Sequence, residues 1–265
     1  MNNKIWMVGN SQLHLSVITE FCSEDDFSRL YQDWKSLRIS EGKFFKDGNE
    51  INYLFCNMGL LGQISFDGEN VSHTQNMSIF LNKIDRDASH IVIMLRGNEF
   101  AFESLVETPV PWDFSYNNSP AIKGRQLLKI KDVSAHLAKA TNATLATCLL
   151  YKINFPKAKI WYVTPPPPLE SENHILSNPE GFKDLFEKFG VRPFSVRKKI
   201  YQVMYDSLSS SLDNFGIKTL RAPLKSFTDT GGLREDFASG CLHGNHLYGR
   251  AIFELMEKED FYAPL

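Results

Sequence analysis

The chain has 265 residues, 43% of them hydrophobic, and a formal net charge of −2. This apolar fraction is enough to bury a sizeable core, which excludes global disorder. The nearly balanced charge supplies no positive field for a phosphate backbone, so we expect no nucleic acid partner. The length favours one elaborated domain over residues 1–265 rather than two full domains.

The apolar run at the start of the chain covers only Ile5 to Val8, which is too short for a secretory signal or a membrane span. The four cysteines show no C-x-x-C spacing, as is usual in a reducing compartment. We therefore expect a cytoplasmic protein with no membrane span, in which Cys56 and Cys148 are core thiols. The sequence leaves the oligomeric state open.

Five segments are predicted to be strands, because they are continuous apolar runs of the kind found where a parallel sheet is covered on both faces. They lie at residues 4–8, 51–56, 90–95, 159–164 and 217–220. Helical periodicity occupies most of the intervening chain. It covers residues 25–37, 76–84, 125–152, 179–189, 196–215 and 247–257. This alternation predicts a flavodoxin-like, three-layer α/β/α fold around a central, mostly parallel five-stranded sheet.

An irregular insertion at about residues 107–124 interrupts this pattern and is rich in proline and aromatic residues. A loop of this length is a candidate for a lid or a substrate wall. Trp112 and Tyr116 within it are candidates to stack on a substrate sugar ring, and they could equally cap the core.

Small and polar residues follow the predicted strands, where ligands bind in open parallel sheets. Ser11 follows the first strand, Gly62 the second and Asn98 the third, while His243 precedes the last helix. A serine nucleophile needs a base, and the oxyanion that its attack creates needs hydrogen-bond donors. This set contains both.

These positions resemble the four short blocks of the SGNH (GDSL-type) hydrolases, which contribute Ser, Gly, Asn and His. The matching segments are residues 8–11 (VGNS), 57–62 (NMGLLG), 96–99 (RGNE) and 240–245 (GCLHGN). Asn10 stands where the family most often has Asp, and Arg96 and Glu99 replace the commoner Gly and Asp. Each block alone is common, so the specificity lies in four blocks that occur in order.

The resemblance implies that Ser11 attacks an ester while His243 takes its proton. It places the oxyanion on the backbone N–H groups of Ser11 and Gly62 and on the side-chain amide of Asn98. Substrates of the family are small acyl esters, often acetyl groups on carbohydrates, or lipids, and no metal or organic cofactor is implied. An acyltransferase that uses the same site is an alternative, and a catalytically impaired binding protein of this fold is another.

One departure concerns the third member of a catalytic triad. The family normally has Asp three residues before the histidine, and this chain has Gly240. Asp236 or Asp229 could reach the imidazole instead, a backbone carbonyl could orient it, or the site could be crippled. The presence of all four block residues together favours an active Ser–His pair.

Two other histidines need an interpretation. His246 forms an H-x-x-H pair with His243, but no carboxylate or third histidine lies nearby in the sequence, so we expect no metal. His14 follows Ser11 by three residues and is predicted either to lie on a helix face or to line the pocket. Cys241 is expected to pack rather than react.

Overall fold

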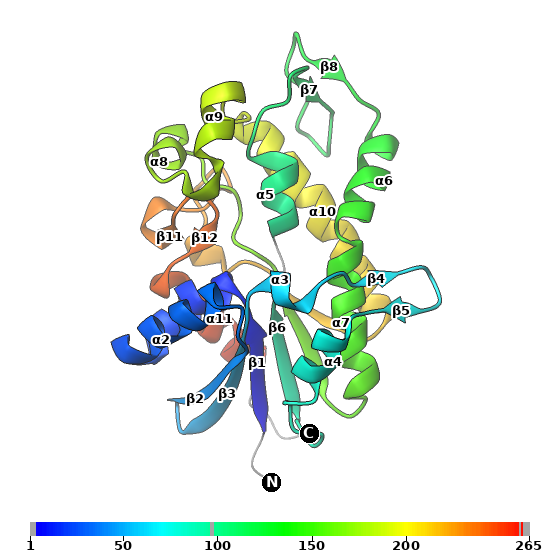
Figure 1. Cartoon of the computed structure of the whole chain (residues 1–265). Coiled ribbons are helices and arrows are strands. Elements are labelled where there is room, and N and C mark those ends of the chain that lie inside the picture. The colour runs from blue at the N-terminus through cyan, green and yellow to red at the C-terminus, as the bar shows by residue number, and fades with distance from the viewer. Residues whose placement is uncertain (1–3, 96–97, 260, 262–265) are drawn as a thin grey trace.

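The centre of the molecule is a six-stranded sheet in the order β10-β9-β6-β1-β3-β2 (Figure 1). The computed structural model describes residues 4–95, 98–259 and 261. The strands are β1 (Ile5–Gly9), β2 (Ser40–Lys46), β3 (Asn49–Phe55), β6 (His90–Met94), β9 (Lys159–Val163) and β10 (Lys218–Leu220). All neighbouring pairs are parallel except β2 with β3. The prediction of a mostly parallel sheet is therefore confirmed.

The sheet has one strand more than the sequence predicts. The additional strand, β2, pairs antiparallel with β3 at the edge of the sheet. Asp47 and Gly48 join the two strands with φ angles of 49° and 77°, the left-handed values that a tight hairpin turn requires. The Asp-Gly dipeptide was a signal for this hairpin, but the strand that precedes it carries charged residues and is only half-buried, so its apolar pattern is weak.

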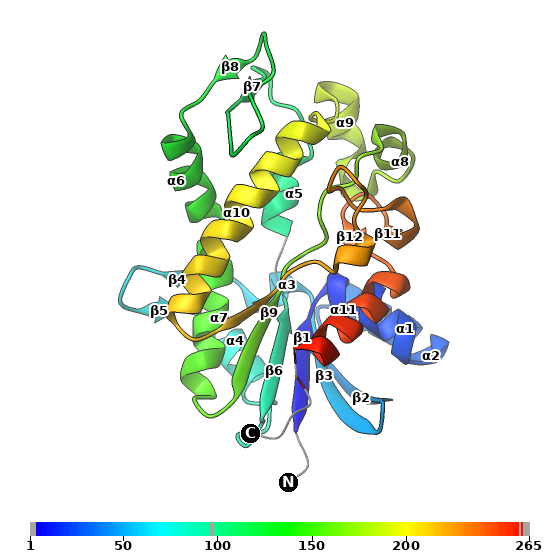
Figure 2. The same cartoon turned by 180° about the vertical axis from the view of Figure 1, so that it is seen from behind.

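Successive side chains along the strands of the sheet point alternately into two separate cores. In β1, Trp6 and Val8 point into one core, while Ile5 and Met7 point into the other. The first core is closed by α4 (Gln75–Leu81), α7 (Asn142–Asn154) and α10 (Phe194–Asn214). The second is closed by the π-helix η1 (Leu13–Ile18), α2 (Glu24–Lys35) and α11 (His246–Lys258). The two groups of helices lie on opposite faces of the sheet in Figures 1 and 2, which confirms the three-layer α/β/α arrangement.

Shorter elements fill the connections, several of them beyond the carboxyl edge of the sheet (Figure 1). They are α1 (Thr19–Phe21), α3 (Met58–Leu61), β4 (Ser65–Phe66), β5 (Val71–Ser72), α5 (Asn98–Ser104), β7 (Trp112–Asp113), β8 (Gln126–Leu127), α6 (Ile130–Ala140), α8 (Glu172–Ser177), η2 (Glu180–Phe182), α9 (Lys183–Phe189), η3 (Leu224–Ser226), η4 (Glu235–Phe237), β11 (Ala238–Ser239) and β12 (His243–Gly244). The helical pattern predicted over residues 125–152 is thus divided into β8, α6 and α7. Thr141 marks the break between the two helices, where its hydroxyl donates to the carbonyl of Leu137. Across the described residues, we find no helix with the length and apolarity needed to cross a membrane.

The irregular segment at residues 107–124 is anchored to α10 by a buried lysine. The Lys199 ammonium lies 2.7 Å from Asp113 Oδ1, and the two side chains are 1% and 0% exposed. The same ammonium donates to the carbonyl oxygens of Phe114 at 2.7 Å and Pro120 at 3.1 Å. Buried charges are tolerated only when they are paired and hydrogen-bonded in this way. The segment is therefore tied to the body of the fold at three points.

A buried histidine at the start of β6 makes the stability of the fold depend on pH. His90 is fully buried, its ring packs against Phe261, and its Nδ1 lies 3.1 Å from the hydroxyl of Ser89. Burial, and then the charge of Lys159, lower the pKa of His90 from 6.5 to about 4. The unfolded chain therefore takes up this proton at a higher pH than the folded chain does. The resulting stabilisation is present above about pH 6.5 and is lost as the pH falls toward 4.

We predict that this histidine removes on the order of 2 kcal/mol from the free energy of unfolding between about pH 7.5 and pH 5. Urea unfolding of the wild type and of His90→Gln at both pH values measures this contribution. The variant should lose less stability on acidification than the wild type. Equal losses in the two proteins would show that His90 does not carry the effect.

Candidate active site

The sheet places Ser11 at the point where the strand order reverses. Gly9, the last residue of β1, pairs with Phe55 of β3 on one side and with Met94 of β6 on the other. The chain passes from β3 across β1 to β6 and then continues outward through β9 and β10. A crevice at the carboxyl ends of the strands is expected at such a reversal. Ser11 lies two residues beyond the end of β1 and therefore at the mouth of this crevice.

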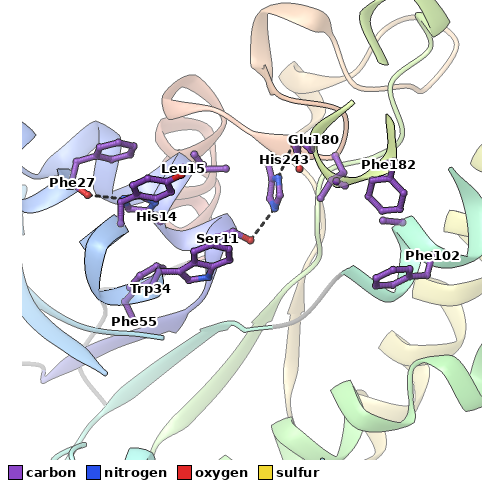
Figure 3. Close-up of a pocket in the computed structure, with 14 residues that line it drawn as sticks. Ser11, His14, Leu15, Phe27, Trp34, Phe55, Phe102, Glu180, Phe182 and His243 are labelled. Carbon is purple, nitrogen blue, oxygen red and sulfur yellow. Dashed lines mark hydrogen bonds and ion pairs between the residues drawn. The ribbon is translucent and has the colours of Figure 1, made fainter. Parts of the chain in front are cut away.

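A cavity of about 610 Å³ occupies this place. Its walls include Ser11, His14 and Leu15, which follow β1, and Ala101 and Phe102 of α5, which follows β6. Figure 3 shows Ser11 and His243 near the centre of the cavity, with aromatic side chains to either side.

Ser11 and His243 are in direct contact in this cavity. The Ser11 Oγ lies 2.9 Å from His243 Nε2, although the two residues are 232 positions apart in the sequence (Figure 3). His243 lies in β12 and is 8% exposed. This distance lies within hydrogen-bond range. A general base must lie within that range of the group whose proton it abstracts.

The second ring nitrogen of His243 faces Glu180. The His243 Nδ1 lies 3.3 Å from Glu180 Oε1, and the backbone N–H of Cys241 donates to the same oxygen at 3.2 Å. Glu180 begins η2 with a φ of 47°, in the left-handed region that non-glycine residues rarely occupy. Such a conformation costs on the order of 1–3 kcal/mol and recurs at active sites. A carboxylate is thus present where the imidazole of a triad needs one.

The two aspartates predicted for this position lie elsewhere. Asp236 forms an ion pair with the guanidinium of Arg234, with Oδ2 and Nη2 2.6 Å apart. Asp229 is exposed in a turn, and within the described part of the chain it makes no contact with the His243 ring. The sequence prediction considered only carboxylates near His243, whereas Glu180 lies 63 residues before it and outside all four blocks.

The geometry also explains why residue 240 is glycine. Gly240 has a φ of +67°, and a Cβ atom at this position would overlap Glu180 Oε1 and lie 2.7 Å from Glu180 Cδ. The Glu180 carboxylate therefore occupies the space beside residue 240 that an aspartate side chain would need. Gly240 and Glu180 form a matched pair, in which the small residue leaves room for the acid from another segment.

Gln12, which the sequence analysis did not single out, links the serine and histidine segments. Its side-chain Oε1 accepts a hydrogen bond from the backbone N–H of Gly244 at 3.3 Å, and its Nε2 donates to Ser16 at 3.3 Å. Gly249 of α11 packs so closely on η1 that a Cβ atom there would overlap the carbonyl of Ser16. Gln12 is buried, and a buried amide needs hydrogen-bond partners. The sequence carries no signal of that burial, which arises from the tertiary packing.

His14 satisfies both sequence interpretations, because it lies on the helix η1 and lines the cavity. Its Nε2 lies 3.0 Å from the carbonyl oxygen of Phe27, and its ring stacks on the Phe27 ring with centroids 4.1 Å apart. Burial lowers the pKa of His14 from its ordinary value of 6.5. The neutral ring is thereby favoured, which suits an apolar wall. Cys241 is buried as predicted, and burial raises the pKa of its thiol to about 12.

The remaining candidates are not among the described residues that line this cavity. Gly62 is the C-cap of α3, with a φ of +69°. This helix follows β3, the strand next to β1 in the sheet. Trp112 packs against the guanidinium of Arg192, and the Tyr116 hydroxyl lies 3.1 Å from Asp206 Oδ2. Asn98 begins α5, but its side chain and residues 96–97 of the third block lie outside the described residues.

No protein-family model matches the chain, and a search of curated proteins finds no match. The solved structures to which it is similar include the periplasmic domain of a lipopolysaccharide acetyltransferase from Salmonella ser. Paratyphi A, at 13% identity and a TM-score of 0.46, covering 98% of this chain and 84% of that one. A GDSL-like lipase from Bacteroides thetaiotaomicron has 13% identity and a TM-score of 0.40, with coverages of 97% and 87%. A carbohydrate acetylesterase from Sinorhizobium meliloti has 12% identity and a TM-score of 0.41, with coverages of 98% and 100%. These likenesses have low identity and low TM-scores, so the function has to be inferred from the chain's own residues.

Proposed function

We propose that the protein is a serine ester hydrolase in which Ser11 is the nucleophile and His243 is the general base. The observation that carries the proposal is the 2.9 Å contact between Ser11 Oγ and His243 Nε2. It lies in a cavity at the carboxyl edge of the sheet, and a carboxylate stands behind the imidazole. The combination of nucleophile, base and acid is the arrangement that activates a hydroxyl for attack on a carbonyl.

The proposed reaction has two halves. In the first, a bond forms between Ser11 Oγ and the ester carbonyl carbon while His243 Nε2 takes the hydroxyl proton. The tetrahedral intermediate collapses, the proton passes to the leaving alcohol, and an acyl-enzyme remains. In the second half, His243 removes a proton from water, the water oxygen attacks the acyl carbon, and the carboxylic acid leaves as Ser11 regains its proton. Glu180 stabilises the imidazolium that forms in each half.

The oxyanion needs donors that are already in place before the reaction. We propose the backbone N–H groups of Ser11 and Gly62 and the side-chain amide of Asn98, as the family resemblance implies. Two features support this assignment. Gly62 and Asn98 follow β3 and β6, the two neighbours of β1 in the sheet. Ser11 begins the helical segment that runs on through η1 and α1, so the positive end of that segment faces the site.

The resemblance implies esters of small acyl groups, such as acetyl on a carbohydrate, and transfer to another alcohol would use the same acyl-enzyme. Trp112 and Tyr116, the candidates either to stack on a sugar or to cap the core, contact Arg192 and Asp206, and neither lines the cavity around Ser11 among the described residues. A binding protein without turnover is the competing class, and labelling of the serine distinguishes it from an enzyme.

We predict that an alkyl fluorophosphonate labels the wild-type protein and that Ser11→Ala abolishes the labelling, because the reagent needs an activated serine hydroxyl. The variant should also lower kcat for p-nitrophenyl butyrate by about 10³-fold or more. Ser207→Ala, which alters an exposed serine of α10, is the matched control and should label like the wild type. A wild-type protein that ignores both reagents would exclude the enzyme and support the binding protein.

We predict that Glu180→Gln lowers kcat by about 10²-fold to 10⁴-fold, because a neutral amide no longer stabilises the imidazolium. Asp236→Asn should stay near the wild-type rate, since Asp236 is paired with Arg234. Gly240→Ala should mimic Glu180→Gln by displacing the carboxylate, and the double variant should lose little more than either single one. Two results would contradict a role of Glu180 in the triad. One is a loss of kcat in the double variant equal to the product of the two single losses, and the other is a large loss of kcat in Asp236→Asn.

A further inference from the structure

The walls of the cavity around Ser11 are mainly aromatic. On one side stand Phe27, Tyr31 and Trp34 of α2 together with Phe55 of β3, and we call these four side chains the aromatic wall. Phe102 of α5 and Phe182 of η2 are opposite, on the far side of the Ser11–His243 pair (Figure 3).

The polar side chains of the cavity are few, and those other than Tyr31 and Trp34 are already engaged. His243 contacts both Ser11 and Glu180, and the His14 ring nitrogen is engaged with a backbone carbonyl. Among the described lining residues there is no Lys, Arg, Asp, Asn or Gln. A site that selects a sugar needs such side chains to satisfy the hydroxyl groups, which would otherwise be buried without partners. The lining therefore disfavours a carbohydrate group inside the cavity.

The rings along one side are nearly parallel. The planes of His14 and Phe27 meet at 14°, those of His14 and Tyr31 at 7°, and those of Tyr31 and Trp34 at 5°. Phe27, Tyr31 and Trp34 follow one another at helical spacings of four and three residues, so they form one stripe of α2. The stripe presents an extended aromatic surface to the cavity.

Some of this aromatic surface lies open to water. Phe102 is 74% exposed and Tyr31 is 43% exposed, and both residues line the cavity. Exposed apolar surface beside a cavity is typical of a ligand-binding site, and covering it contributes roughly 25 cal/mol per Å². The cavity volume of about 610 Å³ also lies in the range that holds a drug-sized ligand. An acetyl group would fill only a small part of it.

We infer that the ester carries an extended apolar group, alkyl or aryl, that lies against the aromatic wall beside Ser11. This inference rests on the proposed ester hydrolysis, and it adds the class of substrate. The recognition is by burial of apolar area, while the Ser11–His243 pair at the centre of the cavity supplies the chemistry.

Turnover of a matched series of esters tests the inference. The octanoyl and phenylacetyl esters of p-nitrophenol are compared with the acetyl ester and with an acetylated xylo-oligosaccharide. We expect kcat/KM for the octanoyl or the phenylacetyl ester to exceed that for the acetyl ester by about tenfold or more, since even one methylene group in a hydrophobic pocket changes kcat/KM by about tenfold or more. The better of the two tells whether the group is alkyl or aryl. An acetyl ester or acetylated sugar that matches the best apolar ester would overturn the inference.

Phe102→Ala tests the location of the apolar group. Because Phe102 is mostly exposed, its loss leaves the core intact, and the preference for the apolar ester over the acetyl ester should fall about fivefold or more. Phe45→Ala is the matched control, since Phe45 is 65% exposed on β2 and does not line the cavity. An unchanged preference in Phe102→Ala, or an equal fall in the control, would contradict the proposed location.

Binding without turnover separates this inference from the proposed function. Calorimetry with octanoate and with phenylacetate on Ser11→Ala should detect binding that Phe102→Ala in the same background weakens. If the wild type hydrolyses no ester but this binding is found, the hydrolase proposal fails and the apolar site stands. If the wild type prefers acetyl esters and the Ser11→Ala protein binds neither acid, the apolar site fails and the hydrolase stands.

Discussion

The imidazole of His243 is the point at which distant parts of the chain meet. Its Nε2 contacts Ser11, which follows the central strand β1, and its Nδ1 faces Glu180 of η2. The residue after it, Gly244, donates its backbone N–H to the side chain of Gln12, next to Ser11. The relative position of hydroxyl and imidazole therefore depends on the packing of α11 against η1 as well as on the two side chains themselves. A tight backbone contact, at Gly249, holds those two helices together.

Much of the fold could be predicted because parallel strands covered on both faces must be continuously apolar. All five segments predicted on that basis are strands of the central sheet. The strand β2 was missed for the opposite reason. It lies at the edge, pairs on one side only, and mixes charged residues with Phe44 and Phe45, so its sequence carries little of the apolar pattern.

The site was predictable where it coincides with short blocks and unpredictable where it depends on tertiary contacts. The meeting of Ser11 with His243 follows from the rule that strand ends share one edge of a parallel sheet. Glu180 gave no such signal, because it lies in a stretch with ordinary helical periodicity and no local feature marks it as an acid. The role of the aromatic stripe of α2 could not be predicted from the sequence either. A stripe of Phe27, Tyr31 and Trp34 has the same spacing whether it covers a core or lines a cavity, and only the position of α2 decides between the two.

The carboxylate beside the His243 ring comes from Glu180 and not from residue 240, and this has a consequence for how such proteins are recognised. A search that requires an aspartate three residues before the histidine would classify this chain as inactive, although a carboxylate stands beside the ring. Because the acid comes from a separate segment, neither the serine block nor the histidine block encodes it. The identity of the acid in divergent homologues is then better sought in space, around the second nitrogen of the ring, than at a fixed place in a motif.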